Sequence, residues 1–459
     1  MLIDKHEADN ILERIPGLII KMSPELATID KVLDDDELFC MIRNDLAQRY
    51  PKTLTAGRKS TPVEVILRML TIKHLYNLSY EQTELQVADS LVLRQFCRVY
   101  LQVPPDHSTL CRWANQIQPA TLEAFNQRVM NLAIDSKLTR GRKLRMDGTA
   151  VETTIHYPTD SRLLADSVRV LGRTLTRAKI LLGARTELSK ETFRNRQRSA
   201  RRTARKIAGL SRRGCREQLE PHYQQLTKTT RATIRQAEQV LAEIETQAAE
   251  QGQHLIEKLQ TFIPRARQVL DQTVRRVFAG EKVPAAEKLV SIFEPHSNII
   301  RRGKPNKETE FGHKIWLGEV EGGFIAQYRV LAGNPSDESQ WQPMLESHVQ
   351  QFGQPPWQAS ADRGVHSSDN EAFAAKLGVK RIILPKPGRK SENRRKHEKQ
   401  RWFWRGRRFH AGVEGRISVI KRKHGLDRCR NHGQAGFECW VGWGIIANNL
   451  TAMGRGLSP

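Results

Sequence analysis

The chain has 459 residues, 39% of them hydrophobic and 27% charged, a composition that predicts a folded protein of more than one domain. Lysine and arginine number 75 against 50 acidic residues, and the net charge of +25 points to a polyanionic partner, nucleic acid first. No apolar run approaches the roughly 20 residues of a membrane-spanning helix, and the acidic amino terminus is unlike a signal peptide. We therefore expect a cytoplasmic protein with no membrane partner.

Six cysteines are scattered along the chain without a Cys-x-x-Cys pair. This spacing supports neither a zinc site nor a disulfide framework. We expect them to be reduced and buried.

Helical signals fill the segment from Thr61 to Gln118. Ser79 followed by Gln82 is a capping-box pattern, and Asp106 precedes another helix as an N-cap. Three short capped helices fit a helix-turn-helix DNA reader that presents Arg112 to a groove or a phosphate, and they fit a purely structural bundle equally well. Both interpretations stay open at this point.

Residues 163–293 have the composition of long helices, rich in Arg, Gln, Glu, Ala and Leu and poor in aromatic residues. Basic residues crowd the first half of this segment. They are Arg194, Arg196, Arg198, Arg201, Arg202, Arg205, Lys206, Arg212, Arg213 and Arg216. A solvated helical face would alternate the two signs of charge, so we favour phosphate contact.

Strand signals surround the helical segment. Lys143 to Met146 predicts a short strand that ends at Asp147, and a turn at 321–323 joins two apolar runs into a hairpin. Helices and strands then alternate. We expect helices at 337–351 and 368–377 and strands at 357–361 and 381–384. The pattern predicts an α/β layer with a mixed sheet, interrupted after its first strand by the helical insertion.

Three acids stand where such a sheet would expose them. Asp147 and Asp362 each follow an apolar strand, and Glu414 lies in a predicted helix. Two aspartates at neighbouring strand ends and a glutamate from a facing helix can hold two Mg²⁺ ions, because hard cations prefer carboxylate oxygen. Taken singly, each aspartate could be a turn or helix cap and the glutamate half of a surface ion pair.

The third acid lies in a strongly basic setting. A basic run from Lys386 to Arg408 precedes it and contains Trp402, Phe403 and Trp404. Cations interleaved with aromatic rings suit a nucleic-acid backbone and an unstacked base, although the rings could equally belong to the core. The candidate DNA-binding residues are Arg112, Arg407, Arg408, His410, Arg416, Lys421, Arg422 and Lys423.

At these residues the chain resembles a bacterial insertion-sequence DDE transposase with a ribonuclease-H-like catalytic core. The motifs that carry the resemblance extend over most of the chain. They are Pro105 to Thr109, Asp147 to Ser161, Gly333 to Asp337, Ala361 to Gly364, Ala411 to Ser418 and Lys421 to Leu426.

The resemblance implies that Asp147, Asp362 and Glu414 are the catalytic, metal-binding triad and that Lys421 contacts the DNA of the element ends. A related signature has a tyrosine seven and an arginine four residues before the glutamate. Arg407 and His410 occupy these two places here, so the basic character is kept.

The composition and the resemblance together predict the domain plan, although better-known relatives carry their insertion between the second and third acids, and the resemblance implies the activity. The domains expected are a helical DNA-binding or dimerisation domain at 1–135, a ribonuclease-H-like domain formed by 136–162 and 294–459, and a basic helical insertion at 163–293. The implied enzyme is nucleoid-associated, uses Mg²⁺ or Mn²⁺, and acts as a homodimer on double-stranded DNA with terminal inverted repeats and on target DNA. Cleavage without joining, or DNA binding without catalysis, are the alternatives.

Overall fold

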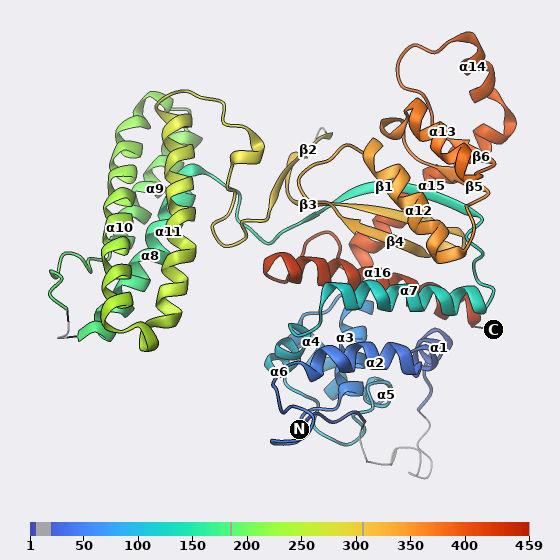
Figure 1. Cartoon of the computed structure of the whole chain (residues 1–459), viewed down its shortest axis with the longest axis horizontal. Helices are drawn as coiled ribbons and strands as arrows, with labels where there is room; N and C mark the ends of the chain where they lie inside the picture. Colours follow the sequence, from blue (N-terminus) through green and yellow to red (C-terminus); the bar gives the residue numbers. More distant parts are fainter. Residues whose placement is uncertain (6–19, 184–185, 305–306, 459) are drawn as a thin grey trace. The chain divides into compact units, whose positions relative to one another are not determined.

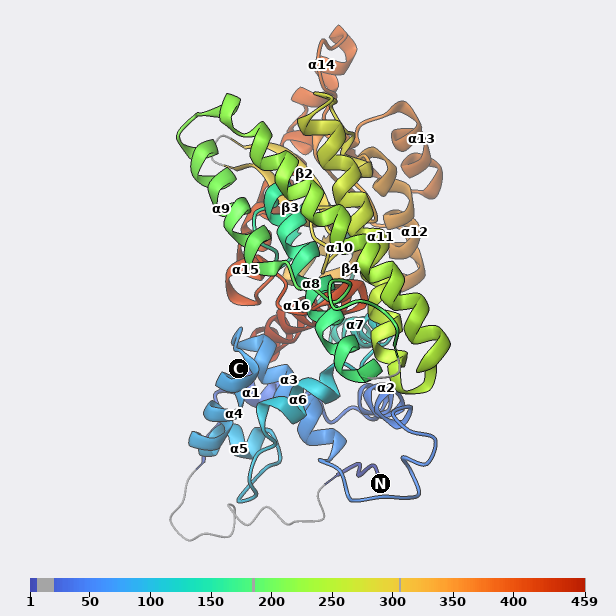
Figure 2. The ribbon, with the colours of Figure 1, turned by 90° about the vertical axis from the view of Figure 1, so that its left-hand side faces the viewer.

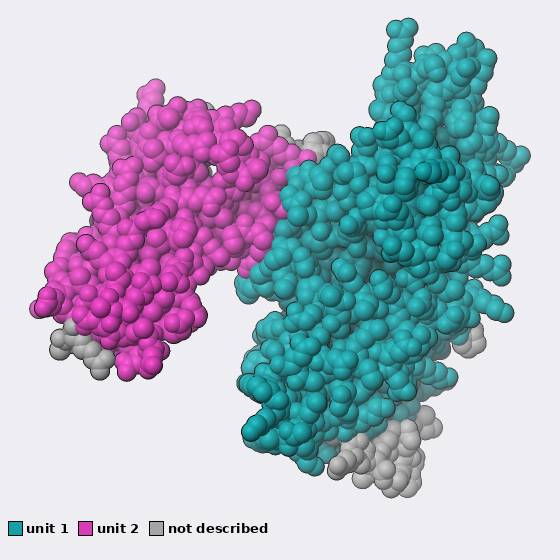
Figure 3. Space-filling view, viewed as in Figure 1, with its two compact units in different colours: residues 1–154, 313–459 teal, residues 155–312 magenta. Residues whose placement is uncertain are grey.

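The computed structural model describes residues 1–5, 20–183, 186–304 and 307–458, which divide into two compact units. Unit 1 comprises residues 1–154 and 313–459, and unit 2 comprises residues 155–312 (Figure 3). The amino-terminal helices therefore belong to the same unit as most of the sheet. The domain boundaries at 135, 162 and 293 stay predictions.

Unit 1 begins with a helical region (Figure 1). Its helices are α1 (Pro24–Val32), α2 (Asp36–Ala47), α3 (Val63–Leu75), α4 (Tyr80–Asp89), α5 (Leu91–Phe96), α6 (His107–Ala114) and α7 (Pro119–Asp135). The predicted capping box of Ser79 and Gln82 opens α4, and the Asp106 side chain caps α6. Both predictions are confirmed. Helix α7 leads directly into the first strand of the sheet.

Six strands of the described residues form one mixed sheet in the order β2-β3-β1-β5-β6, with β4 paired to β3. The strands are β1 (Lys143–Glu152), β2 (Asn298–Lys304), β3 (Lys307–Val320), β4 (Ile325–Val330), β5 (Gln358–Ser360) and β6 (Arg381–Ile383). Strands β1, β5 and β6 run parallel, whereas β3 and β4 form the predicted antiparallel hairpin. The prediction of a mixed sheet is confirmed.

One sequence-based boundary is wrong. Strand β1 does not end at Asp147 but continues to Glu152, where it meets the chain near Arg428 in a single bridge. The apolar residues Ala150 and Val151 are buried there, so burial continues the strand beyond the acid. Asp147 therefore lies within a strand.

Alternation along the strands gives the sheet two different faces. Leu144, Met146 and Trp316 belong to a core shared with α12 (Trp341–Phe352) and α13 (Ser368–Leu377). Val151 and Ile315 point the other way. There they pack against α15 (Arg401–Lys423) and α16 (Gly433–Leu457), while the short α14 (Glu392–Lys399) precedes α15. Helix α15 thus lies across the face that carries the odd-numbered residues of β1.

Unit 2 is built around α8 (Asp160–Leu182), α9 (Gln197–Arg212), α10 (Glu220–Gln247) and α11 (Ala249–Val277), which follow β1 in the chain. These helices pack side by side (Figure 2) around buried residues such as Leu171, Val240 and Leu259. In the same unit, β2 pairs antiparallel with the first part of β3.

Two further sequence expectations concern the whole chain. No helix of the described residues is long and apolar enough to cross a membrane. All six cysteines are free. The expectation of burial is confirmed for Cys97, Cys429 and Cys439, but Cys111 and Cys215 are only half-buried and Cys40 is exposed. Cys40 lies on the outer face of an amphipathic helix, whose inner face carries Leu38, Ile42 and Leu46.

Candidate carboxylate site

The pairing register of β1 and β5 aligns two of the predicted acids. The parallel ladder runs from Lys143 opposite Gln358 to Arg145 opposite Ser360. Asp147 and Asp362 each follow the last pair by two residues. Because side chains two apart on a strand share a face, both aspartates project on the α15 side of the sheet.

Helix α15 brings the third acid to the same place. Asp147, Asp362 and Glu414 all line one cavity of about 230 Å³, together with Arg407 and His410. Glu414 is exposed on the helix surface, and the Asp362 side chain is 69% exposed. The structure therefore brings together the three acids that the sequence places 215 and 52 residues apart.

Hydrogen bonds orient both aspartates. Nε2 of the buried His410 donates to Oδ1 of Asp362 at 3.0 Å, and this bond lowers the pKa of the Asp362 carboxyl below its usual value. Asp147 Oδ1 accepts from the backbone N–H of Gly148 at 2.7 Å. A hydrogen bond to the ionised form of Asp362 keeps that carboxylate charged at neutral pH.

A buried ion-pair cluster fixes α15 over the sheet. The guanidinium of Arg145 donates to both oxygens of the buried Glu319 on β3, at 2.7 and 2.6 Å, and to the carbonyl of Phe409 on α15 at 2.7 Å. Arg416, also on α15, donates to Glu319 at 3.2 Å. The two arginines satisfy the carboxylate from two elements, so Glu319 ties β1, β3 and α15 together.

Close packing of α15 requires small residues at two positions. A side chain at Gly412 would overlap the Arg145 guanidinium, and one at Gly406 would overlap Ile383 of β6. Glycine at these positions therefore lets the helix backbone approach β1, which carries Asp147, and β6.

The donor chemistry of the site fits a hard divalent cation, because carboxylate oxygens are the ligands that Mg²⁺ and Mn²⁺ prefer. No group of three or more His, Cys, Asp or Glu residues within the described ranges is gathered closely enough to hold an ion. The three acids share the cavity wall without forming a closed cluster.

The other predicted site residues lie in several places. Arg407 and His410 line the carboxylate cavity. Arg408 stacks its guanidinium 4.9 Å from the ring centre of the half-exposed Trp404. Lys421 and Arg422 line a second, basic cavity of about 550 Å³ with Arg428 and Arg430, and Arg112 lies exposed on α6, where it donates to Thr109.

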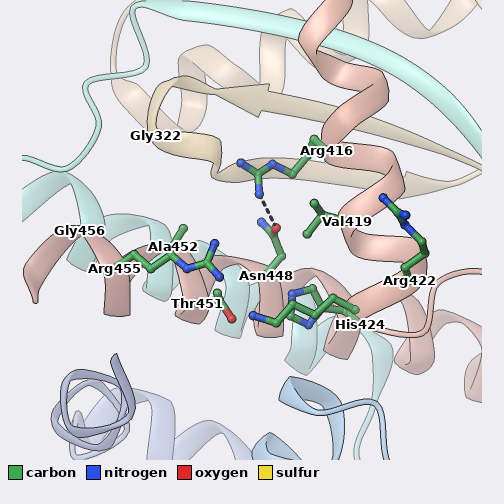
Figure 4. Close-up of a pocket in the computed structure, with 11 residues that line it drawn as sticks. Gly322, Arg416, Val419, Arg422, His424, Asn448, Thr451, Ala452, Arg455 and Gly456 are labelled. Atoms are coloured by element: carbon green, nitrogen blue, oxygen red, sulfur yellow. Dashed lines mark hydrogen bonds between the residues drawn. The ribbon is translucent and has the colours of Figure 1, made fainter. Parts of the chain in front are cut away.

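A third cavity, of about 450 Å³, is lined by residues of α15, among them Arg416, and by residues of α16. Figure 4 shows Arg416 reaching across it to Asn448 of α16, with a hydrogen bond of 3.1 Å. Lys423 and Arg422 also line this cavity. Arg416 is thus engaged in internal contacts with Glu319 and Asn448, whereas Arg422 and Lys423 are exposed.

Sequence reasoning missed the residues that hold the site together. They are Arg145 and Glu319, and Arg145 stands two residues before Asp147 on the same strand face. Alternation along β1 gives Arg145 that placement. Nothing in the sequence pairs it with Glu319, 174 residues away.

A strongly basic chain with three carboxylates around one cavity has the charge and the ligand chemistry of an enzyme that acts on nucleic acid. Two family models match it: Transposase domain (DUF772) over residues 18–116 and Transposase DDE domain over residues 372–454. These matches confirm the resemblance to insertion-sequence DDE transposases and support a transposase function. Searches of curated proteins and of solved structures find no match.

The two matches cover different parts of unit 1. The first includes α1 to α6, and the second includes α15 with Glu414 and nearly all of α16. Asp147 and Asp362 lie outside both, so their assignment depends on the register and on the shared cavity.

Proposed function

We propose that the chain is a DNA transposase that binds the terminal inverted repeats of its own element, cleaves the element ends and transfers the 3′ ends to target DNA. The catalytic part is a ribonuclease-H-like sheet. The observation that carries the proposal is the single cavity lined by Asp147, Asp362 and Glu414, in a chain with two transposase domains.

In this proposal the three carboxylates hold divalent metal, with Mg²⁺ as the physiological ion and Mn²⁺ as a substitute. Asp362 and Glu414 are exposed, so their carboxylates are accessible to an ion that enters the cavity. Bound metal would supply activation of the attacking water or hydroxyl and charge stabilisation for the leaving oxygen of the phosphodiester.

The chain's own cations position the DNA. Arg407 lies exposed on α15 at the edge of the carboxylate cavity and offers its guanidinium to a phosphate beside the scissile bond. His410 stays buried and keeps Asp362 ionised and oriented. Lys421 lies seven residues after Glu414, two helical turns along α15, and with Arg422 and Lys423 it binds the backbone of the element end.

Both ends of an element must be cut and joined together. Each copy of the chain offers one cavity that contains the complete set of three acids. We therefore propose that two copies pair in the active complex, one for each end.

The test uses labelled DNA from both flanks of the chain's own gene, incubated with the purified protein and Mg²⁺. Every cleaved and joined strand is then mapped for the wild type and for Asp362→Asn. We expect cuts at matching inverted ends and joined products, both lost in the variant. Cuts without joined products would establish a nuclease instead, and binding without cuts would establish a non-catalytic DNA-binding protein.

A further inference from the structure

Helix α9 of unit 2 has two faces of opposite character. Ala200, Thr203 and Ile207 are buried against the neighbouring helices. The remaining surface carries every charged residue of the helix, and all of these residues are cations; they are Arg198, Arg201, Arg202, Arg205, Lys206 and Arg212. All six are exposed.

This face borders a groove of about 730 Å³ whose wall contains no acid. The groove is lined by cations of α9, by Arg213 and by His222 of α10. Within the described part of unit 2, Arg201, Arg202 and Arg205 form no ion pair, unlike other arginines of the unit. The groove, here called the α9 groove, therefore concentrates uncompensated positive charge.

Other arginines of the same unit are paired. Arg196 contacts Glu191 at 3.0 Å, Arg267 contacts Glu238 at 2.6 Å, and Arg276 contacts Asp160 at 2.5 Å. These arginines are engaged in contacts within the unit. The packing of unit 2 does not require the cations of the α9 groove, because their side chains point away from the packed side of the helix and into solvent.

The spacing of the groove cations suits a regular polyanion. They recur at each helical turn, about 5.4 Å apart, and the distance from Arg198 to Arg213 is about 22 Å at 1.5 Å per residue. A strand of duplex DNA carries a phosphate about every 3.4 Å along its axis, so the face can follow several phosphates. Neither α9 nor the groove wall contains Phe, Trp or Tyr on which an unstacked base could lie.

We propose that the α9 groove binds the phosphate backbone of duplex DNA without reading its sequence. The inference rests on the proposed function, which supplies DNA as the partner, and it gives the helical insertion a role apart from the carboxylate cavity. Arg201, Arg202 and Arg205 form the centre of the contact. Arginine suits this task because its guanidinium stays charged and donates to two phosphate oxygens at once.

The test measures binding of the full chain to a 30-base-pair duplex of unrelated sequence, in EDTA, by fluorescence anisotropy over a series of salt concentrations. The triple variant Arg201→Ala, Arg202→Ala, Arg205→Ala should bind roughly 30- to 100-fold more weakly near 0.1 M salt. The slope of log K against log salt should fall in magnitude by about 2.7, which is about 0.9 for each lost phosphate contact.

Two matched variants make the test specific. Lys228→Ala, Arg231→Ala, Arg235→Ala removes the same charge from exposed positions of α10 outside the groove wall and should change the affinity less than threefold. Replacing Arg201, Arg202 and Arg205 by lysine keeps the charge and should preserve most of the slope. Equal losses of duplex affinity in the α9 and α10 alanine variants would overturn the proposal that the α9 groove is the binding site. They would indicate a general electrostatic attraction between the basic chain and DNA instead.

A measurement with single-stranded DNA of the same length tests whether the groove prefers duplex DNA. We expect the α9 triple variant to lose less affinity for the single strand than for the duplex, and the reverse would overturn the assignment to duplex. The assay needs no catalysis. If the α9 triple variant binds duplex as tightly as the wild type and the wild type cleaves element ends, only this inference is overturned. If the α9 triple variant binds more weakly as expected but the wild type does not cleave element ends, the proposed function is overturned.

Discussion

The carboxylate cavity of unit 1 and the α9 groove of unit 2 are assembled in opposite ways. The cavity takes one acid from β1, one from the segment after β5 and one from α15, and a buried ion pair between residues 174 apart supports it. The groove takes most of its cations from one helix of 16 residues. A site built from distant segments should fail at a single substitution, whereas a site built from repeated local charges should weaken in steps.

The largest effect is expected at the carboxylates. Asp147→Asn, Asp362→Asn and Glu414→Gln should each reduce the cleavage rate roughly a thousandfold, because each removes a charged ligand worth several kcal/mol of transition-state stabilisation. Duplex affinity should change less than twofold. Single-turnover cleavage measures the rate, with Asp369→Asn and Glu346→Gln as controls at exposed acids away from the cavity. A variant of the three that cuts normally would be removed from the triad.

The next effect tests the support of the cavity. Arg145→Met should lower the free energy of unfolding by about 3 kcal/mol, because it leaves the buried Glu319 with Arg416 alone. Urea denaturation measures the loss. Adding Glu319→Gln should restore part of the stability by removing the uncompensated charge. If Arg145→Met is as stable as the wild type, the ion-pair cluster does not hold α15 in place.

The pH dependence of the free energy of unfolding tests the long-range packing of unit 1, because that packing buries a lysine. Lys73 of α3 is buried beside Tyr80 and Trp440, and burial, reinforced by Arg430, lowers its pKa to about 7. Between about pH 7 and 10 the unfolded chain therefore holds a proton that the folded chain lacks, and stability rises with pH by up to about 1.4 kcal/mol per unit.

Lys73→Met should remove this dependence. We expect the variant to be more stable than the wild type at pH 7, with the difference shrinking toward pH 10, as measured by urea denaturation at several pH values. A constant difference across this range would show that Lys73 keeps its ordinary pKa.

The smallest effect is expected for one cation of the α9 groove. Arg205→Ala should weaken binding to unrelated duplex roughly three- to fivefold near 0.1 M salt and lower the salt slope by about 0.9, the share of one phosphate. Fluorescence anisotropy measures both values. A loss as large as that of the triple variant would contradict the stepwise behaviour and make Arg205 a unique anchor.

Local signals in the sequence predicted much of the fold. The capping box at Ser79, the Asp106 cap and the hairpin at 321–323 depend on neighbouring residues, and the structure confirms all three. The end of β1 was predicted wrongly, because an acid after an apolar run looks like a turn. Burial of Ala150 and Val151, which continues the strand, depends on distant segments of the fold.

The candidate site was predicted to a similar extent. The sequence places Asp147 and Asp362 at comparable strand positions, and the register aligns them. It does not reveal that Glu319 binds two arginines, one of which is the predicted DNA-binding residue Arg416, whose guanidinium contacts Glu319 and Asn448. Charge alone does not distinguish an arginine that binds phosphate from one that completes an internal ion pair.

The most direct test of the account assays Asp362→Asn and the α9 triple variant together, for binding and for cleavage of element-end DNA at saturating protein. The account predicts that Asp362→Asn binds like the wild type and does not cut, while the α9 variant binds weakly and cuts at the normal rate once saturated. Cleavage by Asp362→Asn, or a saturated α9 variant that does not cut, would contradict the account. In that account the carboxylate cavity carries out the chemistry and the α9 groove contributes to DNA binding.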